Sequence, residues 1–311
     1  MTPDRRTFLQ SFAGLAGLLH FTNLNVWADS QTGAAEQPPI ACNQYTWHTF
    51  YQREGRDWSA NLDASLADFA KSGLVGYEPS VSSAEEIRTL APLLKKHRLH
   101  MHSLYVGTTL HKADEADKAL ATVTAIADAA RPLGTKLVVT NPSPIKWGSA
   151  QDKTDTELAV QAANLDRLGA ELKKRGMTLS YHTHDVEMRH SAREFHHMLL
   201  ATDPANVSLC LDVHWIYRGS GNSQVALFDI VKLYGKRITE LHLRQSKGGV
   251  WSETFGEGDI DYPRLAKELK TIGIRPHLVL EQCIEKQSPR TLDAVTAHRQ
   301  DLDYTKAVFG R

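Results

Sequence analysis

Four short apolar runs in the second half of the chain each lead to side chains that can bind a metal. The run from Val207 to Leu211 is followed by Asp212 and His214, which would point to the same side of a strand because strand side chains alternate. A buried carboxylate or imidazole needs a partner that offsets its lost hydration. We therefore predict a shared set of metal ligands from the four runs: His182, Asp212, His242 and Glu281.

Each ligand candidate also has an ordinary structural explanation. A single strand histidine is usually a satisfied core or rim residue, and an aspartate often caps the next helix. The placement of all four at the ends of consecutive predicted strands favours a metal site, because packing does not require one-sided placement. Imidazole and carboxylate ligands suit Mn²⁺, Co²⁺, Fe²⁺ or Zn²⁺ better than Ca²⁺. His184 would face the same side as His182 and is an alternative ligand.

Strand and helix patterns alternate eight times along residues 40–311, with a repeat of about 30 residues. This predicts a single α/β domain, a (β/α)₈ TIM barrel, whose usual size is about 250 residues. An open doubly wound sheet is the alternative, weakened by the lack of a glycine-rich segment after the first strand. The predicted strands are 40–45, 74–78, 99–105, 136–140, 177–184, 207–213, 237–243 and 277–281.

The first 28 residues resemble a twin-arginine (Tat) export signal. Arg5 and Arg6 precede a mildly apolar run, and small residues before position 29 suit cleavage after Ala28. The apolar run is too short for a stable membrane span. We therefore expect residues 1–28 to be a signal peptide and residues 29–39 a linker. The expected partner is the twin-arginine export machinery, and the expected location is the periplasm or another extracytoplasmic space.

The overall composition argues against a nucleic-acid partner. The chain has 36 basic and 36 acidic residues and a formal net charge of zero, whereas nucleic-acid binding normally needs a basic face. The three cysteines, Cys42, Cys210 and Cys283, fall in or beside predicted strands. An odd number of cysteines on strands predicts buried free thiols and no essential disulfide.

Several segments resemble the sugar phosphate isomerase/epimerase family, which has the xylose isomerase-like barrel fold. The resemblance covers about residues 40–308, and the segments are Tyr181–Glu187, Leu211–Gly219, Leu241–Gln245 and Gly256–Asp261. It implies one divalent metal ion, with Mn²⁺ expected and Co²⁺, Fe²⁺, Zn²⁺ or Mg²⁺ as alternatives. It also implies a ketose, inosose or keto-sugar as substrate.

The same resemblance places Asp212, His242 and Glu281 on the family's ligand positions. His182 stands where ketose epimerases carry a glutamate that binds metal and moves a proton. This difference resembles the branch of the superfamily that contains dehydratases and keto-glycoside lyases.

We therefore expect a metal-dependent sugar isomerase or epimerase that removes a proton next to a metal-bound carbonyl, giving an ene-diolate. The candidate bases are Glu281, His184 and Glu78. Glu78 could instead accept a hydrogen bond from a residue next to the site, or cap the helix that follows the turn at Pro79. The alternatives are a keto-glycoside lyase or dehydratase, a sugar-binding protein without catalysis, and an abasic-site endonuclease of the same superfamily. Side chains expected to contact substrate are His102, His214, Arg218, Arg244, Trp47 and Trp251. The alternative role is to orient a carboxylate for the two histidines, a surface ion pair for the two arginines and buried packing for the two tryptophans.

Overall fold

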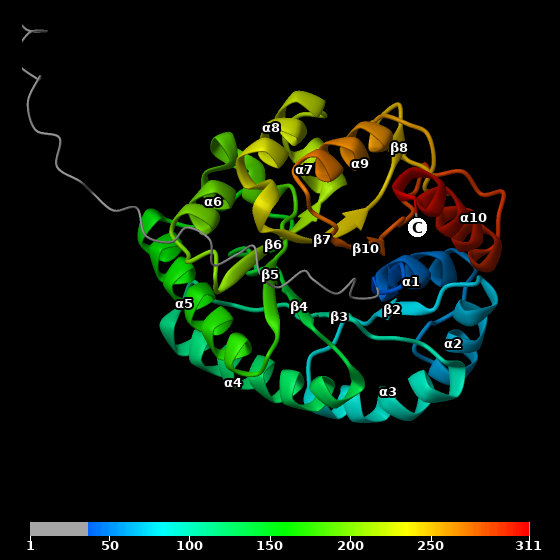
Figure 1. Cartoon of the computed structure of the whole chain (residues 1–311), viewed down its shortest axis with the longest axis horizontal. Helices are drawn as coiled ribbons and strands as arrows, with labels where there is room; N and C mark the ends of the chain where they lie inside the picture. Colours follow the sequence, from blue (N-terminus) through cyan, green and yellow to red (C-terminus); the bar gives the residue numbers. More distant parts are fainter. Residues whose placement is uncertain (1–36, 311) are drawn as a thin grey trace, which may run out of the picture. The chain divides into compact units, whose positions relative to one another are not determined.

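A computed structural model describes residues 37–310; the predicted signal peptide lies outside the described residues. Eight parallel strands form one sheet in the order β2-β1-β10-β7-β6-β5-β4-β3, surrounded by helices (Figure 1). This confirms the predicted barrel class. The strands are β1 (Ala41–Asn43), β2 (Gly76–Glu78), β3 (Ser103–Tyr105), β4 (Leu137–Thr140), β5 (Thr178–Tyr181), β6 (Val207–Asp212), β7 (Ile238–Leu243) and β10 (His277–Leu280).

The sheet closes through short contacts between its two edge strands. Isolated parallel bridges join Gly76 to His100 and Ser80 to Tyr105, and so connect the chain around β2 with the chain around β3. Gly76 also pairs with β1, and a Cβ atom at this position would lie 2.6 Å from the carbonyl oxygen of Ile40. Only glycine allows strands to approach this closely without a backbone shift.

The helices on the outside follow the predicted alternation. Polar side chains cap several of them; Thr154 and Glu157, for example, form a reciprocal capping box at the start of α5. The helices between and after the strands are α2 (Leu62–Lys71), α3 (Ala84–His97), α4 (Ala113–Ala130), α5 (Asp155–Lys174), α6 (Arg189–Leu200), α8 (Gln224–Tyr234), α9 (Tyr262–Thr271) and α10 (Ala294–Phe309).

Two further helices correct the sequence interpretation. The segment after β1, predicted as an aromatic loop, is helix α1 (Gln44–Arg53), capped by the Asn43 side chain. The strand predicted to reach Val213 ends at Asp212, where α7 (Val213–Gly219) begins. Asp212 Oδ1 accepts a hydrogen bond from the Trp215 backbone N–H at 2.7 Å, which is the geometry of a helix N-cap. His214 therefore lies on a helix, not on the strand.

The side chains of the barrel strands are almost all buried. The three cysteines are buried free thiols, as predicted. None of the helices within residues 37–310 combines the length and hydropathy needed to span a lipid bilayer.

Candidate metal centre and active site

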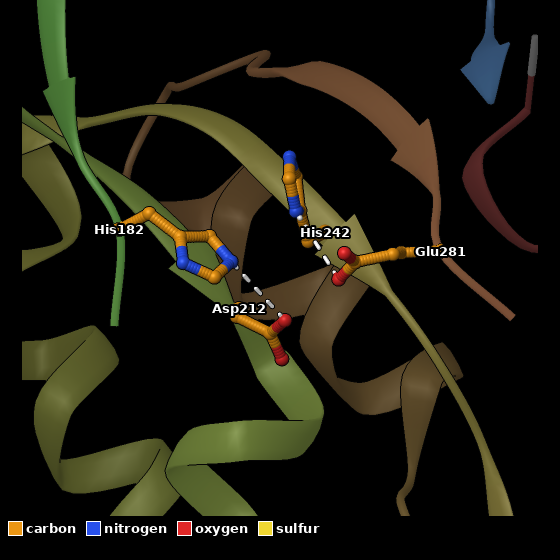
Figure 2. A group of neighbouring side chains, drawn as sticks. All are labelled: His182, Asp212, His242 and Glu281. Atoms are coloured by element: carbon orange, nitrogen blue, oxygen red, sulfur yellow. Dashed lines mark hydrogen bonds and ion pairs between the residues drawn. The ribbon is translucent and has the colours of Figure 1, made fainter. Parts of the chain in front are cut away.

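The four predicted ligands meet at the C-terminal end of the barrel. His182 and Glu281 directly follow β5 and β10, Asp212 ends β6, and His242 lies in β7, where it pairs in register with Asp212. One donor atom from each residue lies within 4.8 Å of every other, and all four residues are buried. Figure 2 shows the four side chains pointing toward one another. Neighbouring parallel strands thus bring together residues up to 99 positions apart (281 − 182).

Unpaired buried atoms in this cluster fit a bound cation. Since Asp212 Oδ1 caps α7, Oδ2 remains for another partner, and this atom is buried without a hydrogen bond to any described residue. His182 Nε2 lies 3.3 Å from it but outside hydrogen-bonding geometry. Buried polar atoms of this kind are rare unless an ion or a water molecule satisfies them. The imidazole and carboxylate donors suit a divalent transition metal.

Arg244 fixes the fourth ligand. Its Nη2 lies 2.8 Å from Glu281 Oε2, and its Nε–H donates to the Glu281 carbonyl oxygen at 2.8 Å. Burial raises the pKa of the Glu281 carboxyl, but the charges of Arg244 and His242 outweigh burial and hold it below its ordinary value. Glu281 is therefore ionised at neutral pH, as a metal ligand must be.

His184 lies beside the cluster, and His182 is the strand-five member of it. The two imidazole rings are 5.0 Å apart, and the His184 ring also contacts exposed Trp147 at 5.0 Å and Trp215 at 5.6 Å. Its Nδ1 atom is buried and has no hydrogen-bond partner within residues 37–310. Burial, with help from His182, lowers the pKa of His184 well below its usual range. The ring is therefore neutral and can accept a proton.

A clamp of Asn141 and Glu187 holds this loop, and the sequence interpretation assigned it no role. The Asn141 side chain donates to the His182 carbonyl oxygen and to Glu187 Oε1, both at 3.1 Å. Glu187 Oε2 accepts from the His184 backbone N–H at 2.6 Å. Burial and the charge of Glu194 raise the pKa of Glu187 to about 7. Glu187 lies in the segment Tyr181–Glu187 that resembles the family, and this resemblance was the one feature of the sequence that could have pointed to it.

Glu78 does not stand in the pocket as a base. It is fully buried, and its carboxylate accepts from Asn43 Nδ2 at 2.6 Å and from Ser103 Oγ at 2.7 Å. Its Oε1 also lies 3.2 Å from His242 Nε2. Because these neighbours enclose the carboxylate, Glu78 contacts a metal ligand and is not placed to contact a substrate.

Two predicted substrate contacts are wrong. Trp47 is fully buried on α1, with its ring stacked on His298 of α10 at 4.3 Å, so it belongs to the core between helices and strands. His102 precedes β3 and contacts His277, the first residue of β10, at 4.8 Å. It therefore lies at the N-terminal end of the barrel, opposite the metal ligands.

Arg244 and Trp251 form one wall of the site. Trp251 belongs to a hairpin after β7, formed by β8 (Ser246–Lys247) and β9 (Val250–Trp251). The Arg244 guanidinium lies 4.4 Å from the Trp251 ring centre and 5.2 Å from that of Trp215. Arg218 faces the Trp251 ring as well, at 4.8 Å, and donates to the Gly249 carbonyl oxygen. Arg218 thus braces the hairpin.

His214 lies against this wall and is fully buried. Its ring centre is 6.0 Å from that of Trp251, and neither ring nitrogen has a hydrogen-bond partner in the described part of the chain. Burial and the Arg244 charge lower the pKa of His214 to about 3. A neutral imidazole with two unpaired nitrogens can both donate to and accept from hydroxyl groups.

The fold and the site together define a family. The sequence pattern of the xylose isomerase-like TIM barrel family matches residues 66–308, and the chain belongs to this family. The predicted family resemblance is confirmed at this level.

Known proteins similar to this chain include sugar-converting enzymes. An inosose dehydratase of Clostridium perfringens is 23% identical, over 71% of this chain and 82% of that protein. The D-allulose 3-epimerase of a Methylomonas species, solved with D-allulose, has a TM-score of 0.67 and 16% identity, covering 88% of this chain and 98% of that one. A xylose isomerase-like barrel protein of Mycobacterium smegmatis, solved with magnesium, has a TM-score of 0.65 and 14% identity, covering 87% and 96%.

Proposed function

We propose that the protein is a divalent-metal-dependent isomerase or epimerase of a sugar or keto-sugar. The observation that carries the proposal is the buried cluster of His182, Asp212, His242 and Glu281 at the C-terminal end of the barrel, where enzymes of this fold place their active sites. The epimerase and dehydratase names among similar proteins agree with a sugar substrate. Mn²⁺ is the expected ion.

The residues around the cluster have separate roles in this proposal. A divalent ion bound there would polarise a substrate carbonyl and so acidify the neighbouring C–H group. His184 accepts that proton at its unpaired Nδ1. His214 and Arg244 bind substrate hydroxyl groups, and the aromatic wall of Trp251 and Trp215 shields the site from water.

Elimination is the second candidate outcome, giving a keto-glycoside lyase or dehydratase. Epimerisation through two carboxylate bases needs one on each face of the substrate carbon, and His182 replaces the glutamate expected on strand five. Glu281 is held by Arg244 at 2.8 Å. A single neutral base, His184, suits proton removal followed by loss of a β-leaving group, and the inosose dehydratase relatives favour the same outcome.

Elemental analysis combined with deuterium exchange tests the proposal. The protein lacking residues 1–28 is expected to hold about one divalent transition metal per chain and to exchange a substrate C–H for deuterium with 3-keto-glucosides or ketoses. NMR spectra identify the carbon whose C–H exchanges. They also distinguish an epimer, an isomer and an eliminated product, and so show which reaction occurs. Protein resupplied with Mn²⁺ that neither retains metal nor catalyses exchange would contradict an enolising enzyme.

We also propose export by the twin-arginine route, based on the sequence of residues 1–28. Replacing Arg5 and Arg6 together by lysine is expected to retain the protein in the cytoplasm, because the arginine pair is the recognised feature. Fractionation of cells expressing each form measures this, with activity per milligram as the control for folding. Unchanged export of the double-lysine variant would refute the proposal.

A further inference from the structure

The side of His242 that faces away from the metal ligands contacts two carboxylates. Nε2 lies 3.2 Å from Glu78 Oε1 and 3.2 Å from Glu240 Oε1, whereas Nδ1 lies 3.3 Å from Glu281 Oε2. The two nitrogens of one imidazole therefore face different groups, with Nδ1 toward the metal cluster and Nε2 toward the barrel interior.

Both carboxylates are unusual residues for their position. Glu78 and Glu240 are fully buried, whereas the interior of such a barrel is normally filled by branched aliphatic side chains. Burying a carboxylate without strong partners is costly. Packing alone therefore does not account for two of them beside the same histidine.

The surroundings of the pair fix it in place. Asn43 at the end of β1 and Ser103 in β3 each donate to Glu78 of β2, which contacts His242 of β7, so side chains from four strands meet here. Glu240 precedes His242 by two residues on β7, which puts both side chains on the same face of the strand. Cys210 Sγ, on the neighbouring strand, lies 3.6 Å from Glu240 Oε1.

We propose that Glu78 and Glu240 are positioning residues that hold His242 through Nε2 and keep Nδ1 free for the metal ion. The proposal rests on the metal site of the proposed function and adds the residues that set its affinity. An imidazole whose N–H donates to a carboxylate keeps one tautomer and one ring orientation, and its other nitrogen becomes a stronger ligand. Glu78 thus acts through His242, which explains its burial away from the substrate.

Mn²⁺ titration of single variants tests this inference without any substrate. Glu78→Gln and Glu240→Gln are each expected to weaken Mn²⁺ binding by about 10- to 100-fold, the usual effect of losing such a partner. Asp301→Asn is the matched control, because Asp301 is a fully buried acidic side chain on α10 that accepts from the Phe255 backbone N–H. The control is expected to lower thermal stability and leave the Mn²⁺ dissociation constant unchanged.

The ¹⁵N shifts of His242 give a second readout that needs neither metal nor turnover. At a pH high enough to leave the imidazole ring neutral, the metal-free protein is expected to carry the remaining proton on Nε2, and the glutamine variants a mixture of tautomers. Should either glutamine variant not fold, Ser103→Ala removes a single hydrogen bond to Glu78 and is expected to move both readouts in the same direction. Unchanged affinity and tautomer in the variants would overturn the inference.

Binding of a second ion would also overturn it. Cys210, Glu240 and His242 have donor atoms within 4.8 Å of one another. Two Mn²⁺ or Zn²⁺ ions per chain, with one lost in Cys210→Ser, would make Glu240 a ligand and not a positioning residue. A protein that binds no Mn²⁺ but shows the expected change of tautomer would instead contradict the proposed function and keep the role of the pair.

Discussion

Replacing Asp212 with asparagine is expected to strip the metal ion and lower turnover by about 10³-fold or more, corresponding to the loss of several kcal/mol of metal-supplied stabilisation. The two oxygens of Asp212 have separate tasks. Oδ1 accepts from the Trp215 N–H at the start of α7, and Oδ2 faces His182 in the ligand cluster. Asparagine keeps the first oxygen and replaces the second with an NH₂ group, which cannot bind a cation.

The asparagine variant therefore separates metal binding from folding. Asparagine and aspartate cap helices about equally well, so Asp212→Asn is expected to keep the thermal stability of the metal-free protein, whereas Asp212→Ala loses about 1 kcal/mol more. Asp261→Ala provides the control, because Asp261 caps α9 in the same way and is not part of the cluster. Metal content, turnover and melting of the metal-free forms measure these effects. A metal-replete, active Asp212→Asn protein would remove Asp212 from the ligand set.

The ligand cluster could be predicted because the position of a residue within a strand pattern shows at which end of the barrel it lies. A buried parallel strand reads as a short apolar run, and its last residues lie at one end of the barrel. This rule placed Asp212, His242 and Glu281 together although no two are close in sequence. The same rule placed His182 in this cluster even though β5 itself ends at Tyr181.

Residues outside regular strands were harder to place. Trp47 was expected at the pocket because it follows β1, but α1 turns its ring toward α10. Aromatic residues have modest helix propensity, so tertiary packing determines this helix more than local preference does. His102 was misplaced because the predicted strand began at Leu99, whereas β3 begins at Ser103. In a strand this short, an error of a few residues in the predicted start moves a residue from one end of the barrel to the other.

Contacts inside the barrel, away from the shared strand ends, could not be predicted from the sequence. Glu78 and His242 are 164 residues apart (242 − 78) and meet inside the barrel at 3.2 Å. Glu78 ends a strand, as a catalytic base would, and the sequence offered no means of knowing that Asn43 and Ser103 enclose it. The sequence does not indicate a role for Glu240 either, since a single glutamate in a strand is common and only its contact with His242 distinguishes it.

Replacing His184 with alanine is expected to reduce substrate C–H exchange by about 10²- to 10⁴-fold, the usual contribution of a general base, with the metal retained. The retention of metal follows from geometry, since His182 and not His184 belongs to the four-residue cluster. Because removal leaves a space beside Trp147 and Trp215, added imidazole is expected to restore part of the exchange. His214→Ala is the matched control, expected to raise KM without rescue by imidazole.

The pH dependence of the wild-type enzyme follows from the same assignment. The base must be neutral to accept a proton, and burial lowers the pKa of His184 well below the ordinary 6.5. Activity is therefore expected to persist through pH 6.5 and to fall at lower pH, where the imidazole becomes protonated. This acid limb should disappear from the residual activity of His184→Ala, because its titrating group is gone. An unchanged exchange rate and an unchanged acid limb in that variant would transfer the role of base to Glu281, whose carboxylate Arg244 holds 2.8 Å away.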